Sequence, residues 1–129
     1  MMRLLLVVFV LVPIIGLSQK PIELKSKFFG VYEGKIASFL MDSGKDLLSV
    51  EESPITIEIA EETILFAIGS NKKSGIYTVL FEADKYFLLD CKINGQLANE
   101  RVVVFKKGKK ISRDGLYPQP NTILLKSKN

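Results

Sequence analysis

The chain has 129 residues with one cysteine, no histidine and no tryptophan, and 18 basic against 14 acidic side chains give a formal net charge of +4. One cysteine excludes an intramolecular disulfide, and the lack of histidine removes the commonest general base, transition-metal ligand and partner of a nucleophilic Ser or Cys. No motif groups the remaining carboxylates, Lys, Tyr and Ser, so the sequence predicts no enzyme, no cofactor and no metal site.

The N-terminus has the pattern of a bacterial export signal. Met1-Met2-Arg3 is a short positive region, residues 4–15 are an uninterrupted apolar run, and Gly16-Leu17-Ser18 supplies the small residues that a signal peptidase recognises. We expect residues 1–18 to be removed and the protein to reach the periplasm or the outside of a Gram-negative cell. The apolar run is shorter than the roughly 18–20 residues of a membrane span; a retained N-terminal anchor is the alternative.

The chain after residue 18 has 111 residues, the size of one small domain. We assign residues 19–27 to an N-terminal extension and residues 28–129 to a single domain. Its main pattern is a period-2 alternation of apolar and polar residues in short runs, which is typical of antiparallel strands with one buried face.

The first predicted strand covers residues 30–40, and residues 41–53 are the least regular part. Within that part we expect a turn at 42–46 and either a short strand or a helical turn at 47–50. Residues 69–75 are expected to form a loop, and Asn94-Gly95 a tight turn. The remaining predicted strands are 55–59, 63–68, 76–81, 86–93, 101–105, 111–113 and 122–126.

These strands form a meander of seven or eight, joined by short connections. Short connections make sequence neighbours spatial neighbours, and a meander of eight strands can remove its exposed edges by closing. The sequence therefore predicts an all-β, antiparallel up-and-down barrel. An open sheet folded over itself is the competing architecture.

Two segments resemble the lipocalin-like (calycin) barrels. Gly30-Val31-Tyr32-Glu33-Gly34 is similar to the Gly-x-Trp opening of that family, with Tyr32 in the place of the aromatic residue that closes one barrel end. Residues 77–91 resemble the turn and the aromatic-aliphatic strand that follows it in the family. The resemblance implies a barrel closed by Tyr32 that binds a small hydrophobic or amphipathic molecule.

Aromatic residues predicted to face inward are the candidates to line a ligand cavity. A barrel of about eight strands is either packed solid or wide enough for one small ligand, and the short chain favours a mostly filled interior. We place the ligand near Tyr77, Phe81 and Phe87, at the end opposite Tyr32. The candidate ligand-binding residues are Phe66, Tyr77, Phe81 and Phe87.

Basic residues concentrate in the last quarter, where residues 101–129 hold eight Lys and Arg and one acidic residue. Lys106, Lys107, Lys109 and Lys110 surround Gly108 in a predicted hairpin loop. Such a loop could contact an anionic envelope surface or an acidic protein, and export argues against nucleic acid. The alternative interpretation is a solvated turn whose lysines discourage strand pairing.

Cys91 alternates with Leu89 and Ile93, which predicts a buried core thiol without reactivity. Two functions remain from the sequence. The first is an exported, non-catalytic, lipocalin-like protein that binds a small hydrophobic or amphipathic ligand. The second is a structural or interaction protein of the cell envelope, or an inhibitor, that acts through the basic hairpin.

Overall fold

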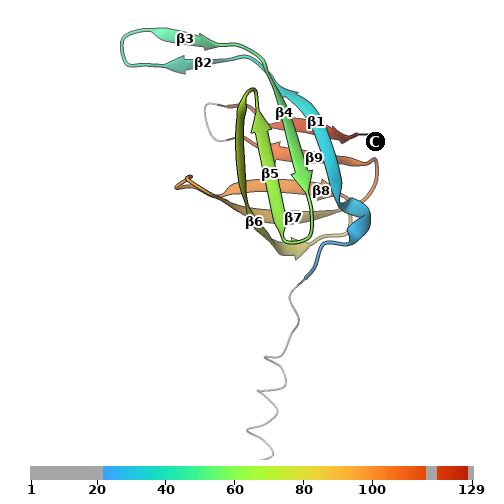
Figure 1. Ribbon diagram of the computed structural model, residues 1–129. Coiled ribbons are helices and arrows are strands. Elements are labelled where there is room, and N and C mark those ends of the chain that lie inside the picture. Colours follow the sequence, from blue (N-terminus) through green and yellow to red (C-terminus); the bar gives the residue numbers. More distant parts are fainter. Residues whose placement is uncertain (1–21, 116–118, 128–129) are drawn as a thin grey trace, which may run out of the picture.

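The computed structural model describes residues 22–115 and 119–127; the expected export signal lies outside these residues. They form a closed antiparallel barrel with a short 3-10 helix, η1 (Ser26–Phe28), before the first strand and a two-stranded hairpin that projects from one end (Figure 1). Across the described residues, no helix has the length and apolar character needed to cross a membrane.

Eight strands close the barrel in the order β1-β10-β9-β8-β7-β6-β5-β4. From β4 to β10 each strand pairs with the next along the chain, and β1 closes the barrel by pairing with both β4 and β10. The predicted all-β meander is confirmed, as a closed barrel and not an open sheet. The barrel strands are β1 (Gly30–Ile36), β4 (Ser53–Ile59), β5 (Thr63–Ile68), β6 (Asn71–Glu82), β7 (Tyr86–Ile93), β8 (Glu100–Phe105), β9 (Lys110–Asp114) and β10 (Thr122–Lys126).

The projecting hairpin consists of β2 (Phe39–Asp42) and β3 (Leu47–Val50), which pair only with each other among the described strands. The first strand is therefore shorter than the predicted 30–40, since residues 37–38 separate β1 from β2. Residues 47–50 are a strand and not a helical turn. The hairpin is inserted between β1 and β4, two strands that pair side by side in the barrel.

The predicted loop over residues 69–75 was wrong. Ile68 pairs with Asn71, so Gly69 and Ser70 alone make the turn and β6 begins at Asn71. Gly69 adopts a φ of 59° there, a left-handed conformation that glycine reaches at little cost. As a result β6 has 12 residues and runs along the whole barrel wall.

The core follows from strand alternation, because every second residue of a barrel strand points inward. Ile55, Ile57 and Ile59 of β4 are buried, as are Leu89 and Cys91 of β7. The burial predicted for Cys91 is confirmed, and burial raises the pKa of its thiol to about 12. Aliphatic side chains thus fill the middle of the barrel. The two ends differ in the side chains that lie beyond this aliphatic layer.

Candidate functional site

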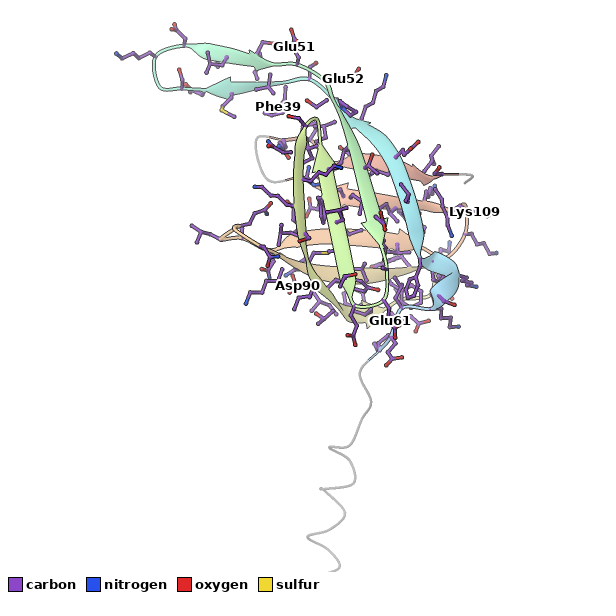
Figure 2. All side chains as sticks on the ribbon, viewed as in Figure 1. Phe39, Glu51, Glu52, Glu61, Asp90 and Lys109 are labelled. Atoms are coloured by element: carbon purple, nitrogen blue, oxygen red, sulfur yellow. The ribbon has the colours of Figure 1, made fainter. Side chains whose placement is uncertain are left out.

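The two ends of the barrel are built from different connections. The closed end carries helix η1 and the β4–β5, β6–β7 and β8–β9 turns. The mouth is the opposite end, with the β5–β6 turn, the loop over residues 94–99, the end of β9, the start of β10 and the β2–β3 hairpin. Figure 2 shows Phe39 at the base of that hairpin, over the mouth, and Glu61 at the other end of the molecule.

Aromatic side chains pack against one another at the closed end. The Tyr32 hydroxyl donates a hydrogen bond of 2.7 Å to the Phe28 carbonyl oxygen, and the Phe28 ring meets the Phe87 ring edge-on at 5.3 Å between centroids. The Lys106 ammonium lies 5.1 Å from the centroid of the Phe87 ring. Burial raises the pKa of Tyr32. The packing at this end agrees with the place expected for Tyr32.

The mouth contains a cavity of about 560 Å³. Its wall combines apolar residues with convergent polar groups, the composition typical of small-molecule sites. The lining residues come from β2, β5, β6, β8, β9 and two loops: Phe39, Met41, Phe66, Ile68, Asn71, Lys73, Gln96, Leu97, Ala98, Glu100, Arg113 and Gln119.

A buried ion pair forms part of the cavity wall. Arg113 Nε and Nη2 donate to the two carboxylate oxygens of Glu100 at 3.0 and 3.1 Å, and both side chains are only 3% exposed. The Gln119 side-chain oxygen accepts from Arg113 Nη1 at 2.9 Å, and Gln96 donates to Glu100 at 3.2 Å. The Arg113 guanidinium also lies 5.9 Å from the centroid of the Phe66 ring. These contacts hold the guanidinium in one orientation.

Strand alternation explains why two charged residues are buried here. Glu100 shares the inward face of β8 with Val102 and Val104, and Arg113 shares that of β9 with Ile111. The hairpin between β8 and β9 brings the two rows together. The sequence carries a signal for this pair, since opposite charges replace apolar residues in two adjacent inward rows.

Lys73 lies on the same inward row of β6 as Asn71. It pairs in register with Phe66 and forms no ion pair with any described residue; the remaining residues contain no Asp or Glu. Thr122, beside Arg113 on β10, has a buried hydroxyl without a hydrogen-bond partner among the described residues. Thr122 and the Glu100–Arg113 pair are thus buried polar groups of the mouth, whereas Lys73 and Asn71 are exposed.

Phe66 is the one predicted ligand-binding residue that lines this cavity. Tyr77 instead contacts the closed-end turn through a 2.7 Å hydrogen bond from its hydroxyl to the Ala60 carbonyl, and it lines a separate cavity of about 440 Å³ with Leu24 and Phe29. Phe87 is buried in the closed end. The structure does not bring the four residues into one site.

The predicted inward orientation of Phe81 was wrong. The register shifts between Val79 and Phe81, so Leu80 is an extra residue that reverses the alternation. Phe81 consequently pairs with Leu88, is 44% exposed, and meets the Tyr86 ring at 6.0 Å. The ligand position expected near Tyr77, Phe81 and Phe87 therefore falls at the end that Tyr32 closes, and the cavity with the buried pair lies at the other.

The four lysines of the predicted basic loop lie at the closed end and differ in their contacts. Lys106 forms a 2.6 Å ion pair with Glu82, whose pKa this hydrogen bond lowers. Lys110 places its ammonium 5.1 Å from the centroid of the Phe105 ring. Lys107 and Lys109 are exposed. Only these two present their charge to solvent without such a contact.

Neither a family model nor a curated protein nor a solved structure matches the chain. The similarity to lipocalin-like barrels therefore stands on architecture, an antiparallel closed barrel of eight strands. Within the described residues, no group of three or more Cys, Asp or Glu side chains is placed to hold a metal ion. The functional argument rests on the mouth cavity itself.

Proposed function

We propose that the protein is an exported, non-catalytic barrel that binds a small amphipathic molecule in its mouth. The observation that carries the proposal is the cavity of about 560 Å³ beside the Glu100–Arg113 pair. Apolar wall residues such as Phe66 and Ile68 supply binding area, and the fixed polar groups supply orientation. The export signal expected at residues 1–18 would deliver the barrel to a compartment where amphipathic molecules have to be carried through water.

A neutral fluorescent probe tests the site directly. N-phenyl-1-naphthylamine should show enhanced fluorescence when mixed with protein purified after expression of the full sequence. Met41→Asp should weaken binding about tenfold, because it sets a carboxylate against the apolar part of the probe. Met41 is on the projecting hairpin, so the barrel should keep its fold, which circular dichroism checks.

Leu40→Asp is the matched control. Leu40 is the neighbouring residue of β2, is 60% exposed and does not line the cavity. The same carboxylate at this position should leave probe binding unchanged. Equal losses in both variants, or no binding by the unaltered protein, would reject the mouth as the binding site.

A second candidate function uses the closed end. Lys107 and Lys109 lie in the β8–β9 turn, where both are exposed, and give this end a positive charge; Figure 2 labels Lys109. Sedimentation with phosphatidylglycerol vesicles tests contact with an anionic surface, and the double change Lys107→Gln with Lys109→Gln should abolish it. If the unaltered protein does not sediment, the basic turn only adds solubility.

A further inference from the structure

Strand β3 of the projecting hairpin has one edge without a partner among the described strands. Its other edge pairs with β2. The mouth cavity is lined by Phe39 and Met41 of β2 and, among the described residues, by none of β3. Figure 1 shows β2 nearer the barrel and β3 farther from it. The open edge of β3 therefore faces away from the barrel, where another strand can approach it.

The backbone groups on this open edge follow from strand alternation. The Ser43 N–H donates to the Asp46 carbonyl oxygen at 3.0 Å across the hairpin, so the polar groups of Asp46 point toward β2. In an antiparallel strand these groups point alternately to one side and the other. Those of Leu48 therefore also point toward β2, and those of Leu47 and Ser49 point to the open edge.

The residues of β3 do not protect this edge. Natural edge strands are commonly blocked by lysine, proline or a bulge, and β3, with the sequence LLSV, contains neither lysine nor proline. Leu47 and Leu48 are 66% and 50% exposed. A two-stranded hairpin alone is marginally stable in water, so a further strand on the open edge would stabilise it.

A second copy of β3 fits the open edge with matching charges. With a two-fold axis at Leu48, Leu47 lies opposite Ser49 of the second copy, and their outward backbone groups can exchange hydrogen bonds. Lys45 then lies opposite Glu51 of the second copy, on the same face of the sheet. Neither Lys45 nor Glu51 forms an ion pair with any described residue of its own chain.

Other two-fold registers fit less well. Registers shifted by one residue set outward backbone groups opposite inward ones, so the ladder cannot form. An axis at Ser49 sets Asp46 opposite Glu52 of the second copy, and like charges placed directly opposite are destabilising. An axis at Leu47 sets Lys45 opposite an uncharged serine. Only the axis between these two positions gives two ion pairs related by symmetry.

We propose that this hairpin pairs with a second copy of the chain, β3 against β3, in an antiparallel two-fold dimer. The two hairpins form a four-stranded sheet in the order β2-β3-β3-β2, with an ion pair between Lys45 and Glu51 at each end of the new contact. The interface is small, so we expect a dissociation constant of about 10–100 µM. Pairing at this edge leaves the mouth cavity unchanged, because its hairpin residues belong to β2.

Charge reversal tests the partner and the register together. In sedimentation equilibrium up to about 500 µM protein, Lys45→Glu and Glu51→Lys should each weaken the dimer about tenfold, because each turns two attractions into two repulsions. An equimolar mixture of the two variants should associate like the unaltered protein, since each supplies the charge that the other lacks. Lys109→Glu, an exposed lysine at the closed end, is the control and should change nothing.

Proline substitution tests the edge. Ser49→Pro removes an outward N–H without removing a bond to β2, so it should abolish the dimer while circular dichroism shows an unchanged barrel. Leu40→Pro is the matched control. Leu40 pairs in register with Ser49, so its backbone groups point to the free edge of β2, and this change should preserve the dimer.

Four results would overturn the proposal. A protein that stays monomeric up to about 500 µM has no such contact. A mixture of the two charge variants that associates no better than either alone would exclude the register. A dimer lost in Leu40→Pro and kept in Ser49→Pro would use β2 in place of β3. Growth into polymers larger than a dimer would show that both edges pair and that no closed two-fold contact forms.

Discussion

The closed end and the mouth are made from the same strands but bury different kinds of side chain. At the closed end, a tyrosine and two phenylalanines meet, and the one buried hydroxyl among them is satisfied by a backbone carbonyl. At the mouth, the inward rows end in Glu100 and Arg113, which are buried only as a pair. The closed end thus buries aromatic rings with their polar group paired, and the mouth keeps a buried ion pair at a cost in stability.

The largest effect on the free energy of unfolding should come from removing an aromatic ring at the closed end. Phe87→Ala removes a ring that is 1% exposed and packed against Phe28, and it should lower the free energy of unfolding by about 3–5 kcal/mol. Phe66→Ala at the mouth should lower it less, because Phe66 already borders a cavity. Urea unfolding of both variants gives the comparison. Equal losses would show that the two ends are packed alike.

Breaking the buried pair should have the next largest effect. Glu100→Gln leaves the Arg113 guanidinium buried without its counter-charge, and we expect a loss of about 3 kcal/mol in the free energy of unfolding. Replacing both partners, Glu100→Leu with Arg113→Met, should recover most of that loss. The measurement is again urea unfolding.

The double variant also separates stability from binding. It removes the buried ion pair of the cavity wall, so it should unfold near the midpoint of the unaltered protein but bind an amphipathic molecule such as dodecanoate more weakly. If the double variant is less stable than Glu100→Gln, the ion pair stabilises the barrel more than apolar side chains do. The buried pair would then carry no cost in stability.

The strand pattern predicted the barrel well because burial imposes period-2 alternation wherever one face meets the core. It failed where one residue breaks that period. Leu80 is an extra residue in β6, and no local composition marks it, so Phe81 was assigned to the wrong face. Gly69 posed a different problem, because Ser70 and the polar residues that follow resemble a loop although they continue a strand.

The candidate site was harder to predict than the fold. Phe66 was identified as an apolar wall residue, but its polar partners were not, since Glu100 and Arg113 are 13 residues apart and meet only because β8 and β9 form a hairpin. The hairpin over the mouth was missed for a related reason. Phe39 and Met41 belong to a separate sheet whose direction relative to the barrel depends on residues 37–38 and not on periodicity.

Alkaline pH should weaken the mouth side of the barrel through Cys91, which pairs in register with Glu100. Burial, together with the smaller effects of the Glu100 and Asp90 charges, raises the pKa of Cys91 from an ordinary value of 9.0 to about 12. The native state therefore favours the neutral thiol. Its contribution to stability is complete below pH 9 and is lost between pH 9 and 12, at up to about 1.4 kcal/mol per pH unit.

Urea unfolding at several pH values from 8 to 10 measures this loss. Burial also raises the pKa of Tyr32 and Tyr77, but from 10.0, so the fall just above pH 9 belongs mainly to the thiol. Cys91→Ala should be less stable than the unaltered protein at pH 8 and should change less with pH up to 10. An equally steep fall in Cys91→Ala would assign the pH dependence to other groups.

The smallest predicted effect concerns a closed-end turn and has the opposite sign. Glu62, in the β4–β5 turn, has a φ of 64°, a left-handed conformation that costs a residue with a Cβ about 1–2 kcal/mol. Glu62→Gly removes this cost but gains chain entropy in the unfolded state, so we expect a net stabilisation of about 0.5 kcal/mol by urea unfolding. Glu61→Gly is the control: Glu61 has no positive φ, so the same replacement should destabilise the protein. If both variants lose stability, the turn is not strained. A gain at position 62 alone would show that the closed end retains a local strain that one residue can release.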